Sequence, residues 1–210
     1  GAGMTGYAPQ GSGAWLNARV GHLTASRMAD AMAVLKSGKA SEARNKLMIE
    51  LCAERMTGDA APHFVNDAMR WGIEQEPHAK AAYQAHSGEL LDPCGFILHP
   101  TIEHFGASPD ALIGTDAVAE FKCPTSTTHV SWILAGEMPD QHKPQVLAQL
   151  ACTRRTRAVF ASFDPRMPAH RQLFVIEWEP KREEIDAVEE AARQFLRELD
   201  EMFDRLSVTA

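Results

Sequence analysis

Three charged residues in the middle of the chain have the types and the spacing needed to hold a metal ion beside a phosphate. Asp110 follows Ser108 and Pro109, and Glu120 and Lys122 come about ten residues later, separated by one residue. Residues i and i+2 of a β-strand point to the same face, so Glu120 and Lys122 should project together. Asp110 is expected at the end of the preceding strand, and a short hairpin can bring it beside them.

This grouping suits the hydrolysis of a phosphodiester. Two carboxylates and water supply the oxygen ligands that Mg²⁺ prefers. A metal ion there would polarise a phosphate oxygen and lower the pKa of a bound water. A lysine on the same face can orient that water and stabilise developing charge. On spacing alone, the alternative is a solvated strand edge with alternating Glu and Lys. Glu76, on a predicted helix, is a further acidic candidate with a plain surface role as its alternative.

Helices are expected on both sides of a strand-rich middle. Apolar spacing, N-cap residues and terminal glycines predict helices over about 15–23, 24–32, 41–58, 65–86, 126–134, 144–153 and 181–206. Runs rich in β-branched and aromatic residues predict strands at 90–91, 96–98, 104–107, 117–122, 157–163 and 172–178. Pro77 should kink its helix or begin a new one. The order predicts one α/β domain over residues 4–210, a small mixed sheet flanked by helices. Residues 1–3 look like a cloning scar.

The composition is that of a globular protein whose acidity is concentrated at one end. The chain is 45% hydrophobic and 23% charged, which excludes a disordered protein. Residues 183–210 hold nine acidic and three basic residues, most of the net charge of −7, and 181–206 reads as an acidic amphipathic helix. The near-neutral remainder can still bind phosphate through placed basic residues, such as the cluster at Arg154, Arg155 and Arg157.

Other functional classes find little support in the sequence. No apolar run approaches the roughly 20 residues that span a bilayer, so no membrane association is expected. The four cysteines lie far apart without a C-x-x-C pair, which predicts neither a zinc knuckle nor a disulfide framework. Reduced thiols and the lack of a signal-peptide pattern favour a cytoplasmic protein.

The charged set also lies within a longer ordered series of motifs. Residues 108–110, Ser-Pro-Asp, followed by 120–122, Glu-Phe-Lys, look like the PD-(D/E)xK nuclease signature. Further matching stretches are 14–15, 19–21 and 24–26 near the start, 71–72 with Glu76, and 163–167 beyond the core. Together they resemble the bacteriophage lambda exonuclease family of viral-type recombination exonucleases. The resemblance implies a restriction-endonuclease-like core of the PD-(D/E)xK type and a 5′→3′ exonuclease that degrades one strand of linear double-stranded DNA.

The resemblance further implies roles for the charged residues at the centre. Asp110 and Glu120 would be ligands of Mg²⁺, for which Mn²⁺ could substitute. The backbone carbonyl of Phe121 would complete the metal shell. Lys122 would be the catalytic lysine, and Glu76 an additional acid near a second metal.

Other positions match the family's substrate contacts. Gln145 matches a glutamine beside the active centre. Arg19, Ser26 and Ser108 match the pocket that receives the 5′-phosphate, a role that suits arginine because it contacts phosphate oxygens in bidentate fashion. Met69 falls where the family places an apolar wedge at the strand junction, with core packing as the alternative.

The resemblance extends to partners and assembly. It implies a 3′ single-stranded overhang that passes to a single-strand annealing protein, and a phage or prophage protein that acts in the bacterial host cell. The related exonucleases form a ring of three subunits. The charge distribution agrees, since an acidic outer surface repels DNA and closure around the duplex would retain it without strong attraction. We therefore expect a homotrimer with the acidic helix turned outward.

Two other classes of protein stay open at this stage. One is a restriction-type or repair endonuclease built on the same core. The other is a DNA-binding assembly protein that keeps the fold without catalysis, although the presence of all three charged residues argues against decay of the site. The chain also departs from the family pattern, because residues 146–149, Val-Leu-Ala-Gln, lack the aromatic residue often found there.

Overall fold

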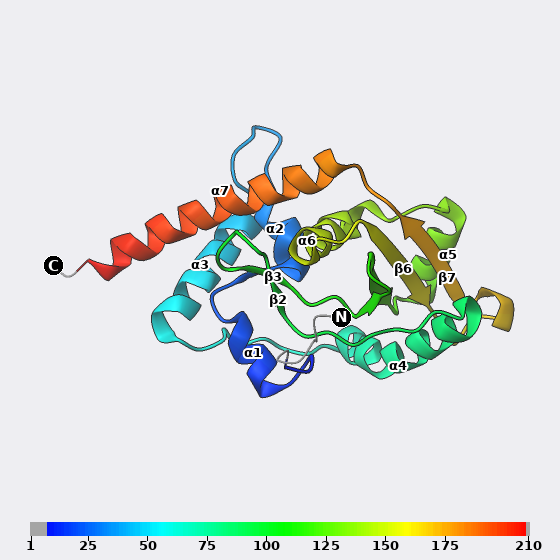
Figure 1. Ribbon diagram of the computed structural model, residues 1–210. Helices are drawn as coiled ribbons and strands as arrows, with labels where there is room; N and C mark the ends of the chain where they lie inside the picture. The colour runs from blue at the N-terminus through cyan, green and yellow to red at the C-terminus, as the bar shows by residue number, and fades with distance from the viewer. Residues whose placement is uncertain (1–7, 209–210) are drawn as a thin grey trace.

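Within residues 8–208, which the computed structural model describes, two small sheets lie between helices (Figure 1). The first has the order β4-β5-β6-β7, with the strands Ala111–Ile113, Ala117–Lys122, Arg157–Phe163 and Leu173–Trp178. The second has the order β1-β3-β2, with the strands Leu23–Thr24, Phe105–Ala107 and Ile97–Leu98. The expected α/β class is confirmed. Residues 1–3, read as a cloning scar, lie outside the described residues.

The helices surround these sheets in chain order. The α-helices are α1 Gly13–Arg19, α2 Met28–Ala31, α3 Glu42–Thr57, α4 Asp67–Ser87, α5 Ser126–Ala135, α6 Lys143–Thr153 and α7 Arg182–Ser207. Short 3₁₀ turns are η1 Ala25–Arg27, η2 Asp140–His142 and η3 Ala169–Arg171. Figure 1 shows α7 along one side of the molecule and α4 along the opposite side.

Local sequence signals explain where the long helices begin and end. The Ser41 hydroxyl accepts a hydrogen bond from the Arg44 N–H at 3.2 Å, which caps the start of α3. Gly58 ends that helix with φ of 78°, a conformation that favours glycine. Asn66 and Gly88 do the same for α4, with Gly88 at φ of 73°. The sequence predicts these stops because capping depends on residues within one turn of the helix end.

The two faces of the larger sheet pack against different helices. Successive residues of a strand point to opposite faces. Val118 and Phe160 therefore join the core that includes α3, α6 and α7, whereas Phe121 and Val159 pack with Tyr83 of α4. β5 pairs in parallel with β6, and the connection between them runs through α5 and α6. This crossover places α6 over the face of β5 to which its even-numbered residues point.

Two expectations about short segments are wrong. Leu23, expected in the first helix, pairs with Phe105 in a parallel two-residue strand. Such a strand is too short to show alternation in the sequence. Leu90 and Leu91, expected as a strand, belong to none, and only Asp92 forms an isolated bridge, to Leu112.

Three further expectations differ from the structure. β4 was not anticipated as a strand, because its three residues lie between the hairpin turn and Asp110. The helix expected after Thr24 is instead the 3₁₀ turn η1 followed by the single turn of α2, and no side chain caps it. Pro77 begins no new helix, and α4 continues through it. The hydrogen bond that Pro77 cannot donate is outweighed by the packing of Ala79 and Tyr83 on the sheet.

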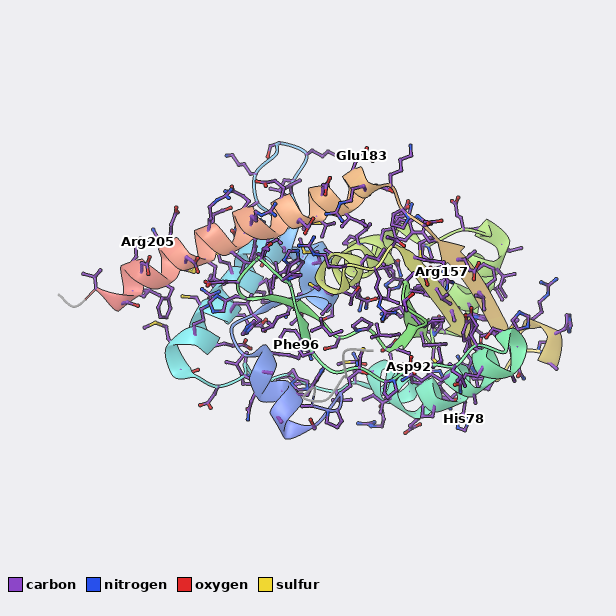
Figure 2. All side chains as sticks on the ribbon, viewed as in Figure 1. His78, Asp92, Phe96, Arg157, Glu183 and Arg205 are labelled. Atoms are coloured by element: carbon purple, nitrogen blue, oxygen red, sulfur yellow. The ribbon has the colours of Figure 1, made fainter. Side chains whose placement is uncertain are left out.

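The last helix carries the acidic C-terminal residues. Its apolar side, which includes Ile185, Phe195 and Leu199, is buried in the core. Figure 2 shows Glu183 and Arg205 near opposite ends of α7. These charges complement the helix dipole, positive at the first turn and negative at the last. None of the helices described is long and apolar enough to cross a membrane.

Candidate active site

The β4–β5 hairpin brings Asp110 beside the end of β5. The Asp110 N–H donates to the Ala119 carbonyl at 3.1 Å, and the Phe121 N–H donates to Asp110 Oδ2 at 2.8 Å. Asp110 and Glu120 are both buried. The hairpin predicted from the spacing of these residues therefore forms, although through a strand that starts after Asp110 rather than one that ends at it.

Glu120 and Lys122 project together, as the alternation predicts. Lys122 Nζ lies 3.1 Å from Glu120 Oε1. Gln145, on α6, joins the pair, because its Nε2 donates to Glu120 Oε1 at 3.3 Å while its Oε1 accepts from Lys122 Nζ at 3.0 Å. The amide thus holds the lysine and the carboxylate in one network.

The electrostatics of this network favour a bound cation. Burial raises the pKa of the Asp110 carboxyl well above its usual range, and the charges of Glu120 and Glu76 raise it further. Burial alone would lower the pKa of Lys122, but the charges of Glu120 and Asp110 outweigh it and hold that pKa above its ordinary value. The lysine therefore stays positively charged, and the site still carries more carboxylates than positive groups.

The donor atoms fit a hard divalent cation. Within residues 8–208, no three or more His, Cys, Asp and Glu side chains are already arranged as a ligand set. Asp110 and Glu120 are nevertheless two buried carboxylates that repel each other, and a dication between them would remove that repulsion. Oxygen donors of this kind suit Mg²⁺ or Mn²⁺. Glu76 reaches Asp110 from α4 and also lies 3.6 Å from Lys80 Nζ.

A cavity of about 240 Å³ joins this acidic centre to the residues expected to bind phosphate. Its lining includes Asp110, Glu120 and all three of the expected contacts, Arg19, Ser26 and Ser108. Lys122, Glu76 and Met69 are not in the lining. The tertiary structure therefore brings Arg19 and Ser26 to Asp110 and Glu120, which lie 84 to 101 positions later in the sequence.

Trp15 contacts two of the residues expected to bind phosphate, Ser108 and Arg19. Its Nε1–H donates to Ser108 Oγ at 2.9 Å, and the Arg19 guanidinium lies 4.0 Å from the centre of its ring. Burial lowers the pKa of Arg19, partly offset by the charge of Glu54. Arg19 Nε is buried and has no hydrogen-bond partner among the described residues, so one donor of this guanidinium is unsatisfied.

Met69 lies away from the cavity, in the first turns of α4. The residue is 45% exposed, and its apolar neighbours Phe64, Val65 and Ile73 are exposed as well. Core packing, the alternative for this residue, is therefore not what the structure shows. An exposed apolar side chain is accessible to a partner or to a base pair.

Two arginines of the basic cluster at 154–157, Arg155 and Arg157, make structural contacts. Arg155 Nη1 donates to the carbonyls of Ile113, Gly114 and Ala117. Arg157 pairs with two exposed acids, Asp116 and Glu177. These two arginines stabilise the β4–β5 turn and the pairing of β6 with β7.

Sequence reasoning missed two residues of the site. Trp15 lies within a motif, but the sequence indicates no role for it, because its contact with Ser108 spans 93 residues. Gln149, completely buried, donates from Nε2 to Glu120 Oε2 at 2.8 Å. Helical spacing could have found it, since residues i and i+4 share a face and Gln145 was already placed beside the centre.

Comparisons with known proteins give the family of the chain and proteins that share its fold. The profile of the YqaJ-like viral recombinase domain matches residues 14–156. The alkaline exonuclease LHK-Exo from Laribacter hongkongensis, solved also in complex with dAMP, is 38% identical and superposes with a TM-score of 0.86 over 93% of this chain and 96% of that one. A phage-related exonuclease from Haemophilus somnus 129PT, 15% identical, shares the fold at a TM-score of 0.68 over 89% of this chain and 97% of that one. No significant match was found among curated proteins.

Proposed function

The chain belongs to the YqaJ-like viral recombinase family, and from that membership we propose a Mg²⁺-dependent 5′→3′ exonuclease that degrades one strand of linear double-stranded DNA. It is a deoxyribonuclease, and its family comprises metal-dependent, viral-type recombination exonucleases. The observation that carries the finer proposal is the shared cavity. One end presents two buried carboxylates, and the other presents a cationic group with free hydrogen-bonding capacity.

Each residue of the centre has a distinct task in this proposal. Asp110 and Glu120 would hold Mg²⁺, with the Phe121 carbonyl as a further donor and Glu76 beside a second ion. Bound Mg²⁺ supplies charge neutralisation for the phosphate and a more acidic water. Lys122, kept charged by its carboxylate neighbours, stabilises negative charge that develops during cleavage. Gln145 keeps the lysine and Glu120 at a defined separation.

The position of the phosphate pocket favours cleavage from a DNA end. Arg19, Ser26 and Ser108 lie in the same small cavity as the carboxylates, so a phosphate bound there lies close to the metal site. A restriction-type endonuclease must let the strand continue past the site in both directions. A partly buried cationic pocket beside the centre instead suits a chain that terminates there, with a 5′-phosphorylated end as the preferred substrate.

A comparison of linear and supercoiled circular duplexes tests the reaction class. Linear DNA should be digested in Mg²⁺ to give a 3′ single strand, while the closed circle stays intact. Ca²⁺ should support binding but poor hydrolysis, because its larger and looser coordination shell positions water badly. Cutting of the closed circle would instead identify an endonuclease.

Removal of the Arg19 guanidinium should flatten the preference for phosphorylated ends. A charge-assisted contact is worth about 1.5–3 kcal/mol, or roughly ten- to over a hundredfold. The measurement is the ratio of digestion rates on duplexes with 5′-phosphate and 5′-hydroxyl ends, for Arg19→Ala and for the unmodified protein. Arg193→Ala, which removes an exposed arginine of α7, is the matched control and should keep the ratio. An unchanged ratio in Arg19→Ala would place this arginine outside the phosphate site.

The proposed assembly is a homotrimeric ring around the duplex. α7 buries its apolar side in the core and leaves acidic residues exposed, which suits an outer surface that repels DNA. We expect light scattering to give three times the chain mass. Digestion should also continue after a heparin trap is added to loaded enzyme. A monomeric mass, together with digestion that stops as soon as heparin is added, would refute the proposed ring.

The remaining assignments concern the substrate path and the cell. A single exonuclease domain spans residues 4–210, and the exposed Met69 acts as the wedge at the strand junction. The 3′ strand passes to a single-strand annealing protein. Digestion takes place in the cytoplasm of a bacterial host, where phage or prophage DNA is recombined.

A further inference from the structure

Gln149 contacts the proposed metal site from a buried position at the edge of the cavity. Its side chain lies in the middle of α6, and the residue is 0% exposed. Nε2 donates to Glu120 Oε2 at 2.8 Å, whereas the other carboxylate oxygen, Oε1, faces Lys122 and Gln145. Both oxygens of Glu120 are therefore held from the protein side, and Gln149 is the one described donor to Oε2.

The backbone of Gln149 is fixed independently of the site. Its neighbours on α6, Ala148 and Leu150, belong to the main hydrophobic core. Its carbonyl accepts a hydrogen bond from Thr153 Oγ1 at 2.8 Å. A donor anchored in this way can fix the orientation of a flexible carboxylate, because the core and not the carboxylate determines where the amide lies.

The other end of the amide points to a second role. Gln149 Oε1 is buried and has no hydrogen-bond partner among the described residues. Gln149 also lines the cavity that holds Asp110 and Glu120. A buried polar atom without a partner is costly, and a water molecule in an adjacent polar cavity is its ordinary partner. The amide is thus oriented with its donor on the carboxylate and its acceptor free.

We infer that Gln149 is a positioning residue of the metal site, which fixes the Glu120 carboxylate toward the cation and accepts a hydrogen bond from cavity water. The inference rests on the proposed function, since it gives Glu120 the part of a metal ligand. Partners in the shell around metal ligands orient them, and their loss costs about 10- to 100-fold in metal affinity or activity. Sequence comparison with the family's motifs does not select this residue, because the stretch 146–149 departs from the pattern.

Metal binding by Gln149→Met tests the inference apart from catalysis. Methionine has a similar length and no hydrogen-bonding amide, so it keeps volume and removes both contacts. Electron paramagnetic resonance measures the concentration of free Mn²⁺ in a titration of the protein. The Mn²⁺ affinity of Gln149→Met should be about 10- to 100-fold weaker than that of the unmodified protein. In DNA digestion, the half-saturating Mg²⁺ concentration should rise by the same factor, while the rate at saturating Mg²⁺ recovers to within about threefold.

Matched variants separate positioning from general repacking. Leu150→Met changes the next buried residue of α6 and should leave Mn²⁺ affinity unchanged, even if it lowers the melting temperature. Gln149→Leu replaces the methionine variant if circular dichroism shows that Gln149→Met is unfolded. Wild-type Mn²⁺ affinity in a folded Gln149 variant would overturn the inference and leave the proposed function intact. Failure of the unmodified protein to bind Mn²⁺, with Asp110→Asn indistinguishable from it, would instead refute the metal site itself.

Discussion

Asp110→Asn or Glu120→Gln should abolish DNA cleavage while the fold persists. Each change removes an anionic oxygen from a site that must neutralise a dication beside a phosphate. Metal-assisted stabilisation is worth several kcal/mol, and each 1.36 kcal/mol is tenfold in rate, so the loss should be at least about a thousandfold. The measurement is the single-turnover digestion rate of a 5′-phosphorylated linear duplex in Mg²⁺.

The same electrostatics predict that Asp110→Asn does not destabilise the metal-free protein. The Asp110 carboxylate is buried and repelled by Glu120 and Glu76, as its raised pKa indicates. A neutral amide removes that repulsion, and its oxygen can still accept the hydrogen bond from the Phe121 N–H. The thermal midpoint without metal should therefore stay level or rise. Asp92→Asn is the control, since Asp92 is exposed and lies outside the cavity lining. Robust cleavage by Asp110→Asn would refute the assignment of the centre.

Lys122→Ala should lose most turnover but keep DNA binding. The ammonium lies 3.1 Å from Glu120 Oε1 and stays charged, so it can stabilise negative charge that forms during cleavage. Removal of one preorganised electrostatic donor costs about 10²–10³-fold in kcat. Binding depends mainly on contacts elsewhere, so the dissociation constant of a linear duplex in Ca²⁺ should change little.

Lys143→Ala provides the comparison for this prediction. Lys143 begins α6 close to Gln145 in sequence, but it pairs with the exposed Asp140 and takes no part in the centre. Its loss removes the same charge from the same region and should leave kcat within about twofold, as expected for an exposed ion pair. Equal losses in both variants would show that Lys122 acts through net charge. Weakened DNA binding by Lys122→Ala alone would make it a substrate contact.

Local signals in the sequence predicted a large part of the fold. The ends of α3 and α4 follow from Ser41, Gly58 and Gly88, because a cap is a contact within one helical turn. The longer strands β5, β6 and β7 show enough apolar or β-branched residues to be found. The three-residue β4 and the two-residue β1 do not, because periodicity needs several repeats to be seen.

The charged centre was predictable for the same reason. Asp110, Glu120 and Lys122 are joined by a hairpin, so their proximity depends on two adjacent strands and on the alternation of side chains along one of them. The family's motifs then indicated where phosphate would bind. That indication names residues but cannot show how Arg19 reaches the carboxylates.

The sequence by itself determined the candidate residues of the charged centre, the ends of the long helices and the α/β class, since each depends on interactions between near neighbours. Only the tertiary structure decided that Trp15 contacts both Ser108 and Arg19. It also decided that Gln149 donates a hydrogen bond to Glu120 and that Arg155 stabilises the β4–β5 turn. These contacts join segments from distant parts of the chain. They form because the core of the whole molecule fixes α1, α6 and the β4–β5 hairpin relative to one another, and no local pattern encodes that arrangement.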